Sequence, residues 1–265
     1  IDTAESGDTP EQTVANFAKK IKRNTAMLIC MHASNLDGRI MPIERLGQLA
    51  RKHRLLFLVD AAQSAGVLDI DVRRMNISFL AVSGHKGLYG PMGTGILVVN
   101  TGVEIHSIIE GGTGSQSLDF NQPVYLPDLL ESGTPNVPGI LGLDAGIRFV
   151  SEMGPKYILA HEQELVDLVA EGLEGIPGVR IYHQPKGVGV ISFSVEGKSS
   201  EEVANMLAQK DIAVRAGLHC APAAHHTLKS PAGGLVRLSF GVFNDKEQVA
   251  EFIRVLKGIL SVQTR

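Results

Sequence analysis

The sequence predicts an α/β fold in which helices cover a largely parallel sheet. Three apolar runs, at 26–34, 55–66 and 77–86, end in small or polar residues, as the buried strands of a parallel sheet do. Stretches with apolar residues at helical spacing accompany them at 10–23 and 42–54. Strands and helices that take turns along a chain are typical of α/β proteins.

The first helix is expected to begin at Pro10, since Thr9 is a good N-cap and Gln12 occupies the third helical position. The apolar run 26–34 should then form a strand that is buried on both faces. After the third strand, a glycine-rich turn leads into a fourth strand at 93–100.

The pattern changes where a long helical region over 142–176 begins, with a break near Gly154 and Pro155. Strands are then expected at 187–195, 212–217 and 235–240, and helices at 200–210 and 245–260. We therefore expect a large domain over 1–145 and a smaller α+β domain over 146–265.

Composition excludes several classes of protein. With 25 basic and 28 acidic residues the formal charge is −3, so no broad basic surface for nucleic acid is expected. No apolar run approaches the roughly 18 residues of a membrane span, and no signal segment is visible. Cys30 and Cys220 lie far apart, as free thiols in a reducing compartment do. A soluble cytoplasmic protein is the expectation.

Polar residues gather where the predicted strands end, and in open α/β sheets ligands bind outside these carboxyl ends. Asp60 directly ends an apolar stretch, where a carboxylate would be partly desolvated and would need a cationic or N–H partner. Taken alone, such an aspartate is more often a helix cap or a turn residue. The strand-end stretches are Ser34-Asn35, Asp60 with Gln63, and Ser83-Gly84-His85-Lys86.

Lys86 precedes the glycines of GHKGLYGPMGTG, whereas the lysine of a P-loop follows them. A solvated loop lysine is the plainer alternative. A lysine at one strand end together with a carboxylate at another fits pyridoxal phosphate (PLP), because the lysine holds the aldehyde and the carboxylate keeps the pyridine nitrogen protonated.

Two stretches, VDAAQSAG at 59–66 and SGHKGLYGPMGTG at 83–95, resemble the signature of the class V aminotransferase family of PLP enzymes. The resemblance is strongest to its cysteine desulfurase and selenocysteine lyase branch. Further matches, in the same order and spacing, are HASNLDGRIMPI, ESGTPNVPGILGL, RAGLHCAPAAH and VRLSFGVFN. The resemblance implies the fold type I, aspartate aminotransferase-like architecture of PLP-dependent transferases.

The resemblance also implies a role for each matching residue. It makes Lys86 the Schiff-base lysine and Asp60 the partner of the pyridinium nitrogen, with Gln63 and Asn35 near the phenolic oxygen of the cofactor or the substrate carboxylate. The residues that it places at the phosphate are Ser83 and His85 and, from the neighbouring subunit, Gly133 and Thr134. A homodimer is therefore implied.

On the same resemblance, Arg237 grips the substrate carboxylate with its planar fork, and Arg215 belongs to the substrate site. An arginine that braces a surface strand is the plainer alternative for Arg237. Cys220 attacks the substrate sulfur, takes it as a persulfide for an acceptor protein, and alanine is released. From its residue type alone, Cys220 would be a buried apolar residue, as we expect of Cys30 in the LICM run.

His219, Cys220, His225 and His226 fall within eight residues and could suggest zinc. Structural zinc sites use pairs of ligands with short regular spacers, and no second pair completes this one, so no metal is expected.

The leading prediction is a PLP-dependent cysteine desulfurase that forms L-alanine from L-cysteine in sulfur metabolism such as iron–sulfur cluster assembly. Selenocysteine lyase, or another class V aminotransferase or lyase, shares the same residues. A non-catalytic, truncated PLP-fold protein is the third alternative. Members of the family are usually longer at the N-terminus, and residues 1–10 have no initiator methionine or preceding strand. We therefore expect a chain without its N-terminal part that binds PLP weakly or not at all.

Overall fold

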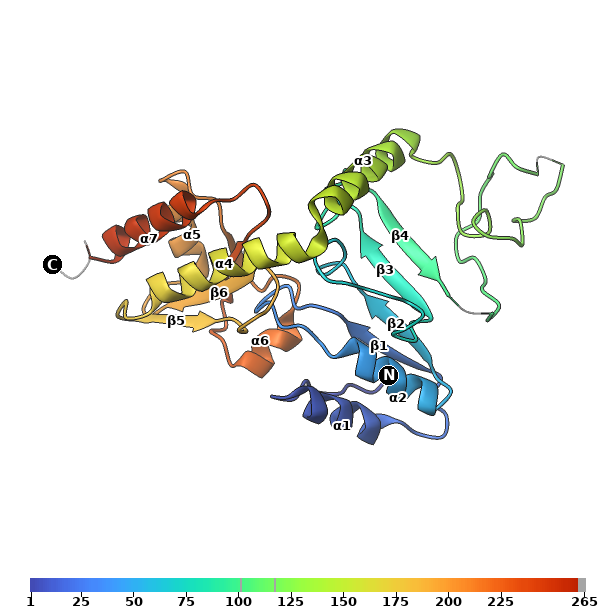
Figure 1. The fold of residues 1–265 in the computed structure, drawn as a ribbon, viewed down its shortest axis with the longest axis horizontal. Helices are drawn as coiled ribbons and strands as arrows, with labels where there is room; N and C mark the ends of the chain where they lie inside the picture. The colour runs from blue at the N-terminus through green and yellow to red at the C-terminus, as the bar shows by residue number, and fades with distance from the viewer. Residues whose placement is uncertain (101, 117, 262–265) are drawn as a thin grey trace.

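The first sheet contains four strands that follow chain order, β1 (Met27–Met31), β2 (Leu56–Asp60), β3 (Phe79–Ser83) and β4 (Gly95–Val99). The structure is a computed structural model, and it describes residues 1–100, 102–116 and 118–261. β1, β2 and β3 are parallel, and β4 returns antiparallel to β3 (Figure 1). The largely parallel sheet predicted from the apolar runs is confirmed.

Helix α2 (Ile43–Lys52) packs on one face of this sheet, and α1 (Pro10–Lys20) packs against α2. The hydroxyl of Thr9 accepts a hydrogen bond from the Gln12 amide at 3.2 Å, so the predicted cap is confirmed. The side chains beneath α2 come from alternate strand positions and form a shared core; they include Leu28, Cys30, Phe57, Val59 and Leu80.

The expectation that the first strand is buried on both faces is wrong for the described part of the chain. Cys30 is buried, as predicted, but Ile29 is 62% exposed and Met31 is 43% exposed. Successive side chains of a strand point to opposite faces, and no described element covers the face that carries these two residues.

The described residues between β4 and the next helix form no helix or strand, and this segment extends outward beyond the edge strand β4 (Figure 1). Helices α3 (Val137–Met153) and α4 (Pro155–Leu173) then connect the first sheet to the second. Gly154 separates them with φ of 85°, a conformation that only glycine adopts readily, so the break is where the sequence predicts it.

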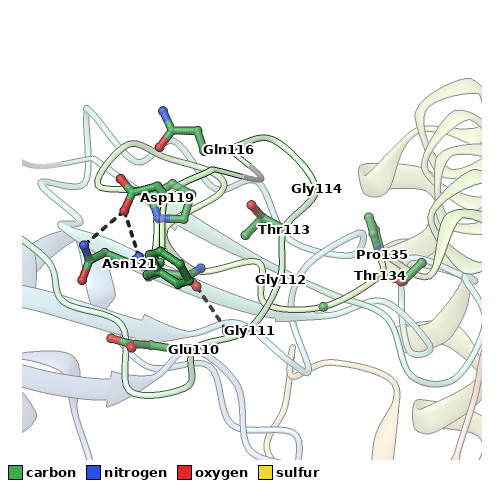
Figure 2. A pocket seen from close by; sticks show the side chains of 14 residues that line it. Glu110, Gly111, Gly112, Thr113, Gly114, Gln116, Asp119, Asn121, Thr134 and Pro135 are labelled. Atoms are coloured by element: carbon green, nitrogen blue, oxygen red, sulfur yellow. Dashed lines mark hydrogen bonds between the residues drawn. The ribbon is translucent and has the colours of Figure 1, made fainter.

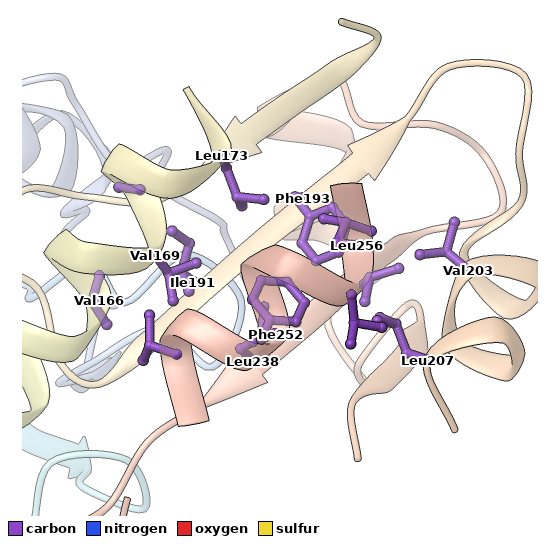
Figure 3. Packing of buried hydrophobic residues seen from close by; sticks show 14 of the residues in the cluster. Val166, Val169, Leu173, Ile191, Phe193, Val203, Leu207, Leu238, Phe252 and Leu256 are labelled. Atoms are coloured by element: carbon purple, nitrogen blue, oxygen red, sulfur yellow. The ribbon is translucent and has the colours of Figure 1, made fainter. Parts of the chain in front are cut away.

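The second sheet is antiparallel, in the order β5-β6-β8-β7. Its elements are β5 (Val179–Tyr182), β6 (Val190–Val195), α5 (Ser200–Ala208), β7 (Arg215–Gly217), α6 (Pro222–Leu228), β8 (Leu235–Ser239) and α7 (Lys246–Ser261). Side chains from α4, α5 and α7 pack with those of β6 and β8 into an apolar core, of which Val169, Ile191, Phe193, Leu207, Leu238 and Phe252 are labelled members (Figure 3).

The two sheets also share buried contacts. Leu36, which follows β1, packs with Tyr182 of β5 and Leu235 of β8. The hydroxyl of Ser192 on β6 donates a hydrogen bond to the Leu36 carbonyl at 2.5 Å. The loop after β1 is therefore anchored to the second sheet. The boundary between domains at residue 145 stays a prediction.

Among the described residues, no helix combines the length and the hydropathy needed to cross a bilayer.

Candidate active site

The carboxyl ends of the three parallel strands lie at one edge of the first sheet. Met31, Asp60 and Ala81 pair in register across this edge. The His32 amide donates to the Asp60 carbonyl at 2.8 Å, and the Ala61 amide donates to the Ala81 carbonyl at 2.8 Å. The strand-end residues Asp60, Gln63, Ser83, His85 and Lys86 therefore belong to one edge, as expected.

Two glycines hold the Lys86 loop against the loop that follows β2. A Cβ atom at Gly66 would lie 2.1 Å from the Gly87 carbonyl oxygen, and one at Gly87 would lie 2.5 Å from the Ala65 oxygen. Neither clash is tolerable, so the two backbones approach this closely only because both residues lack a side chain. The close approach places Lys86 beside the segment that carries Gln63.

The charged groups at this edge are available for a ligand. Lys86 and Asp60 are exposed, and neither side chain has a salt bridge among the described residues. The Asp60 carboxylate accepts a hydrogen bond from the Ala62 amide at 2.9 Å. A free amine and a free carboxylate match the aldehyde and the pyridine nitrogen of PLP, so the residues present fit that cofactor.

The second group of residues surrounds Cys220, which is exposed. The Arg215 guanidinium lies 4.0 Å from the Cys220 sulfur. Arg237 on β8 donates from Nη1 to the Asn35 carbonyl at 3.0 Å, while its buried Nε has no partner in the part of the chain that the structure describes. Burial and the nearby Arg215 charge lower the pKa of Arg237. Among the residues that the structure describes, the guanidinium has no salt bridge, so it is available to a carboxylate ligand.

Asn35 joins the two groups. It follows β1 at the same sheet edge, and its Nδ2 donates a hydrogen bond to the His219 carbonyl at 2.7 Å. Asn35 thus contacts the residue that directly precedes Cys220. The loop of the second sheet that carries the cysteine is in this way tied to the edge that carries Asp60 and Lys86.

His219 itself is buried, at 3% exposure. Its Nε2 donates to the Leu235 carbonyl at 3.0 Å, and its Nδ1 has no hydrogen-bond partner among the described residues. Burial lowers the pKa of His219 to about 4. The ring is therefore neutral at pH 7 and is protonated on Nε2.

Gly133 and Thr134 are not brought to these two groups within this chain. They are exposed and line a hollow of about 700 Å³ on the segment beyond β4, together with residues of the 110–123 loop (Figure 2). The hollow is shaped by the loop's own hydrogen bonds, such as that from the Gly111 amide to Gln122 Oε1 at 3.2 Å. A role for Gly133 and Thr134 at a neighbouring subunit stays a prediction.

The histidines that could suggest zinc are arranged differently. The His219 and His225 rings stack with centroids 6.0 Å apart, and His225 Nδ1 bonds with the Ser230 hydroxyl at 2.6 Å. In the described residues no three His, Cys, Asp or Glu side chains are grouped as metal ligands. Whether the protein binds a metal stays a prediction.

Tyr89 is a site residue that the sequence did not single out. It lies in the Lys86 loop with φ of 53°, and its hydroxyl accepts a hydrogen bond from the Val242 amide at 3.1 Å. Its ring makes edge contacts with Phe149 and Phe243. Tyr89 thus ties the Lys86 loop to the loop after β8. A single aromatic residue between glycines in GLYG was the available signal.

Comparisons with known proteins agree on one family. The family model described as Aminotransferase class-V matches residues 1–252. A probable cysteine desulfurase of Pyrococcus abyssi is 36% identical over 268 residues, covering 98% of this chain and 66% of the relative. A cysteine desulfurase of Shigella flexneri is 33% identical over 240 residues, covering 89% of this chain and 58% of the relative.

Solved structures of cysteine desulfurases share the fold. The apo enzyme from Thermococcus onnurineus NA1 superimposes with a TM-score of 0.83 at 33% identity, covering 99% of this chain and 66% of that one. CsdA from Escherichia coli gives a TM-score of 0.86 at 27% identity, covering 94% and 62%. The expected architecture, fold type I of the PLP-dependent enzymes, is confirmed. The chain spans slightly less than two thirds of the length of these relatives.

Proposed function

Because the chain belongs to the class V aminotransferase family, we propose that it serves a PLP-dependent cysteine desulfurase, which converts L-cysteine to L-alanine and takes the sulfur as a persulfide on Cys220. The observation that carries this proposal is the position of Cys220. It is exposed beside Arg215, and Asn35 ties its loop to the strand edge of Asp60 and Lys86. A transaminase needs no such thiol.

The side chains divide the chemistry among them. Lys86 holds the cofactor aldehyde and carries a proton at Nζ, and Asp60 keeps the pyridine nitrogen protonated. Ser83, His85 and Gln63 complete the cofactor site. Bound PLP supplies an electron sink for the bonds at the substrate α-carbon. The guanidinium of Arg237, assisted by Asn35 and Arg215, binds the substrate carboxylate and fixes its orientation.

The Cys220 thiolate is the nucleophile. It attacks the substrate sulfur, an S–S bond forms as the Cβ–S bond breaks, and the carbon takes up a proton to give alanine. Enzyme thiol plus cysteine therefore yields enzyme persulfide plus alanine, with all atoms accounted for. The Arg215 guanidinium lies 4.0 Å from this sulfur, so a cationic donor stands beside the nucleophile.

The active protein is a homodimer in this proposal, since Gly133 and Thr134 lie away from the chain's own strand edge and would complete the partner's cofactor phosphate site. The persulfide is passed to an acceptor protein for sulfur metabolism such as iron–sulfur cluster assembly. Two unpaired cysteines in the described chain are in keeping with a cytoplasmic setting.

The test is to express the complete reading frame and measure alanine and sulfide from L-cysteine with and without PLP. Cys220→Ser should retain the yellow cofactor but release no sulfide, and Lys86→Ala should lose the cofactor absorbance. Cys30→Ala is the matched control, because Cys30 is buried and contacts no site residue, so sulfide release should persist.

Full activity in Cys220→Ser would instead indicate a class V aminotransferase or lyase without sulfur chemistry. Turnover of selenocysteine but not cysteine would indicate a selenocysteine lyase. A complete protein that never takes up PLP would indicate a non-catalytic member.

A further inference from the structure

The turn that presents Cys220 is strained. The Ala221 amide donates to the Leu218 carbonyl at 2.9 Å, which closes a four-residue turn with His219 and Cys220 at its centre. Both central residues have positive φ, 53° and 59°. A turn of this type I′ kind favours asparagine and glycine, and each other L-residue in this region costs about 1 kcal/mol or more.

A strained turn persists only where its surroundings hold it. Two contacts do so here, and both act on His219. The Asn35 amide holds the His219 carbonyl at 2.7 Å, and the Leu235 carbonyl holds the His219 ring at 3.0 Å. Arg237 fixes Asn35 in turn by donating to its carbonyl at 3.0 Å. The two holding groups come from different sheets, β1's loop in the first and β8 in the second.

We propose that His219 is a positioning residue for Cys220. Held by Asn35 and Leu235, it keeps the left-handed turn in place and thereby keeps the Cys220 sulfur beside the Arg215 guanidinium. We call the two hydrogen bonds that Asn35 and Leu235 make with His219 the clamp. The purpose of the clamp rests on the proposed function, since the sulfur chemistry needs a thiolate in a fixed position. The clamp itself is defined by this chain's own contacts.

The arrangement has a second consequence. Asn35, proposed to bind the substrate carboxylate, also holds the cysteine turn through its side chain, and Arg237, proposed for the same role, bonds the main-chain carbonyl of Asn35. Binding of a carboxylate at these two residues therefore bears directly on the clamp.

The test measures how Arg215 acts on the reactivity of Cys220. The rate of alkylation by iodoacetamide is followed on the tryptic peptide that contains Cys220, in the complete protein without cofactor. Arg215→Gln should lower this rate about two- to fivefold at neutral pH, the size of an exposed charge interaction. Arg215→Gln should leave the alkylation rate of Cys220 unchanged in a variant that lacks one of the two hydrogen bonds on His219.

His219→Leu and His219→Gln form the matched pair that breaks and keeps the clamp. Leucine cannot donate to the Leu235 carbonyl, whereas glutamine places an amide N–H close to the position of Nε2. Neither residue relieves the strain of the positive φ. We expect Arg215→Gln to lower the alkylation rate in the His219→Gln background and to leave it unchanged in the His219→Leu background. His226→Leu, an exposed change nearby, should behave as the natural sequence does.

An equal effect of Arg215→Gln in both His219 backgrounds would overturn the proposal. Cys30, which is 5% exposed, serves as the fold monitor, since its alkylation would reveal unfolding. Should His219→Leu unfold, Asn35→Asp breaks the clamp from its other side, because a carboxylate cannot donate to the His219 carbonyl. If the Arg215→Gln effect depends on the His219 background but the complete protein releases no sulfide, the proposed function is wrong and the clamp is supported. If the complete protein releases sulfide but the Arg215→Gln effect is the same in both backgrounds, the proposed function is supported and the clamp is wrong.

Discussion

Glu162 on α4 is a buried carboxyl that the sequence did not single out. Its Oε2 accepts a hydrogen bond from the Gly189 amide at 3.3 Å. Burial raises the pKa of Glu162 to about 7, although the Gly189 hydrogen bond opposes this shift. Burial, and to a lesser extent the Glu162 charge, raises the pKa of Tyr89. A helix position between polar neighbours gave no sign of such burial.

The raised pKa has a definite consequence for stability. Below the carboxyl's unfolded pKa of about 4.5 both states are protonated, and above about 7 the folded state must bury a charge. The contribution of Glu162 to the free energy of unfolding therefore falls as the pH rises from about 4.5 through about 7. Glu162→Gln should remove this loss and raise the free energy of unfolding at pH 8 by roughly 1 to 3 kcal/mol, as urea denaturation at several pH values would measure.

Glu171→Gln is the control for that experiment, because Glu171 is an exposed carboxyl on the same helix. Its effect should stay within about 0.5 kcal/mol at every pH. If the Glu162→Gln profile ran parallel to that of the natural sequence, the buried charge would not be the cause.

At the scale of elements, the position of the Lys86 loop depends on the contact between Gly66 and Gly87. Gly66 has φ of 86°, and a Cβ there would lie 2.1 Å from the Gly87 oxygen. Gly93, in the same glycine-rich stretch as Lys86, has a similar φ of 78°, but nothing lies within 4 Å of its added Cβ. The two glycines therefore separate the cost of backbone strain from the cost of a clash.

Gly93→Ala should cost about 1 kcal/mol of stability through its left-handed backbone alone. Gly66→Ala should cost at least about 2 kcal/mol more, because the two loops must separate. It should also weaken retention of PLP by displacing Lys86, which the cofactor absorbance after gel filtration would show. Equal losses of stability and cofactor in the two variants would mean that the close approach does not position the loop.

At the scale of the whole molecule, the segment beyond β4 carries large apolar side chains in solvent. Ile108 and Leu118 are each 99% exposed, and Phe120 is fully exposed. The segment projects from the edge of the first sheet (Figure 1). Large apolar side chains exposed on one segment are a feature of protein interfaces. They support the proposed homodimer, in which the same segment carries Gly133 and Thr134.

Ile108→Asp combined with Phe120→Asp should convert the complete protein from dimer to monomer in light scattering, because charged groups at an apolar interface remain desolvated and unpaired. Tyr157→Asp is the control, since Tyr157 is an exposed aromatic residue on α4, outside the segment. A stable dimer that carries both changes would place the interface elsewhere.

Features that depend on neighbours along the chain could be predicted from the sequence alone. Thr9 caps α1, Gly154 divides α3 from α4, and apolar runs form the parallel strands, because capping, turn geometry and alternation act over a few residues. Helix α6 and strand β5 were not foreseen, since seven and four residues are too short for a clear periodic pattern. The pairing of Lys86 with Asp60 as a PLP site followed from their residue types at strand ends, and the roles of the other site residues came from the resemblance.

How those residues meet depends on the tertiary structure. The bond from Asn35 to His219 spans 184 residues of sequence, and that from Arg237 to Asn35 spans 202. The packing of two separate sheets creates both contacts, and no local pattern of residues records them. The same holds for the left-handed turn at Cys220, which its own two residues disfavour and which the surrounding side chains stabilise.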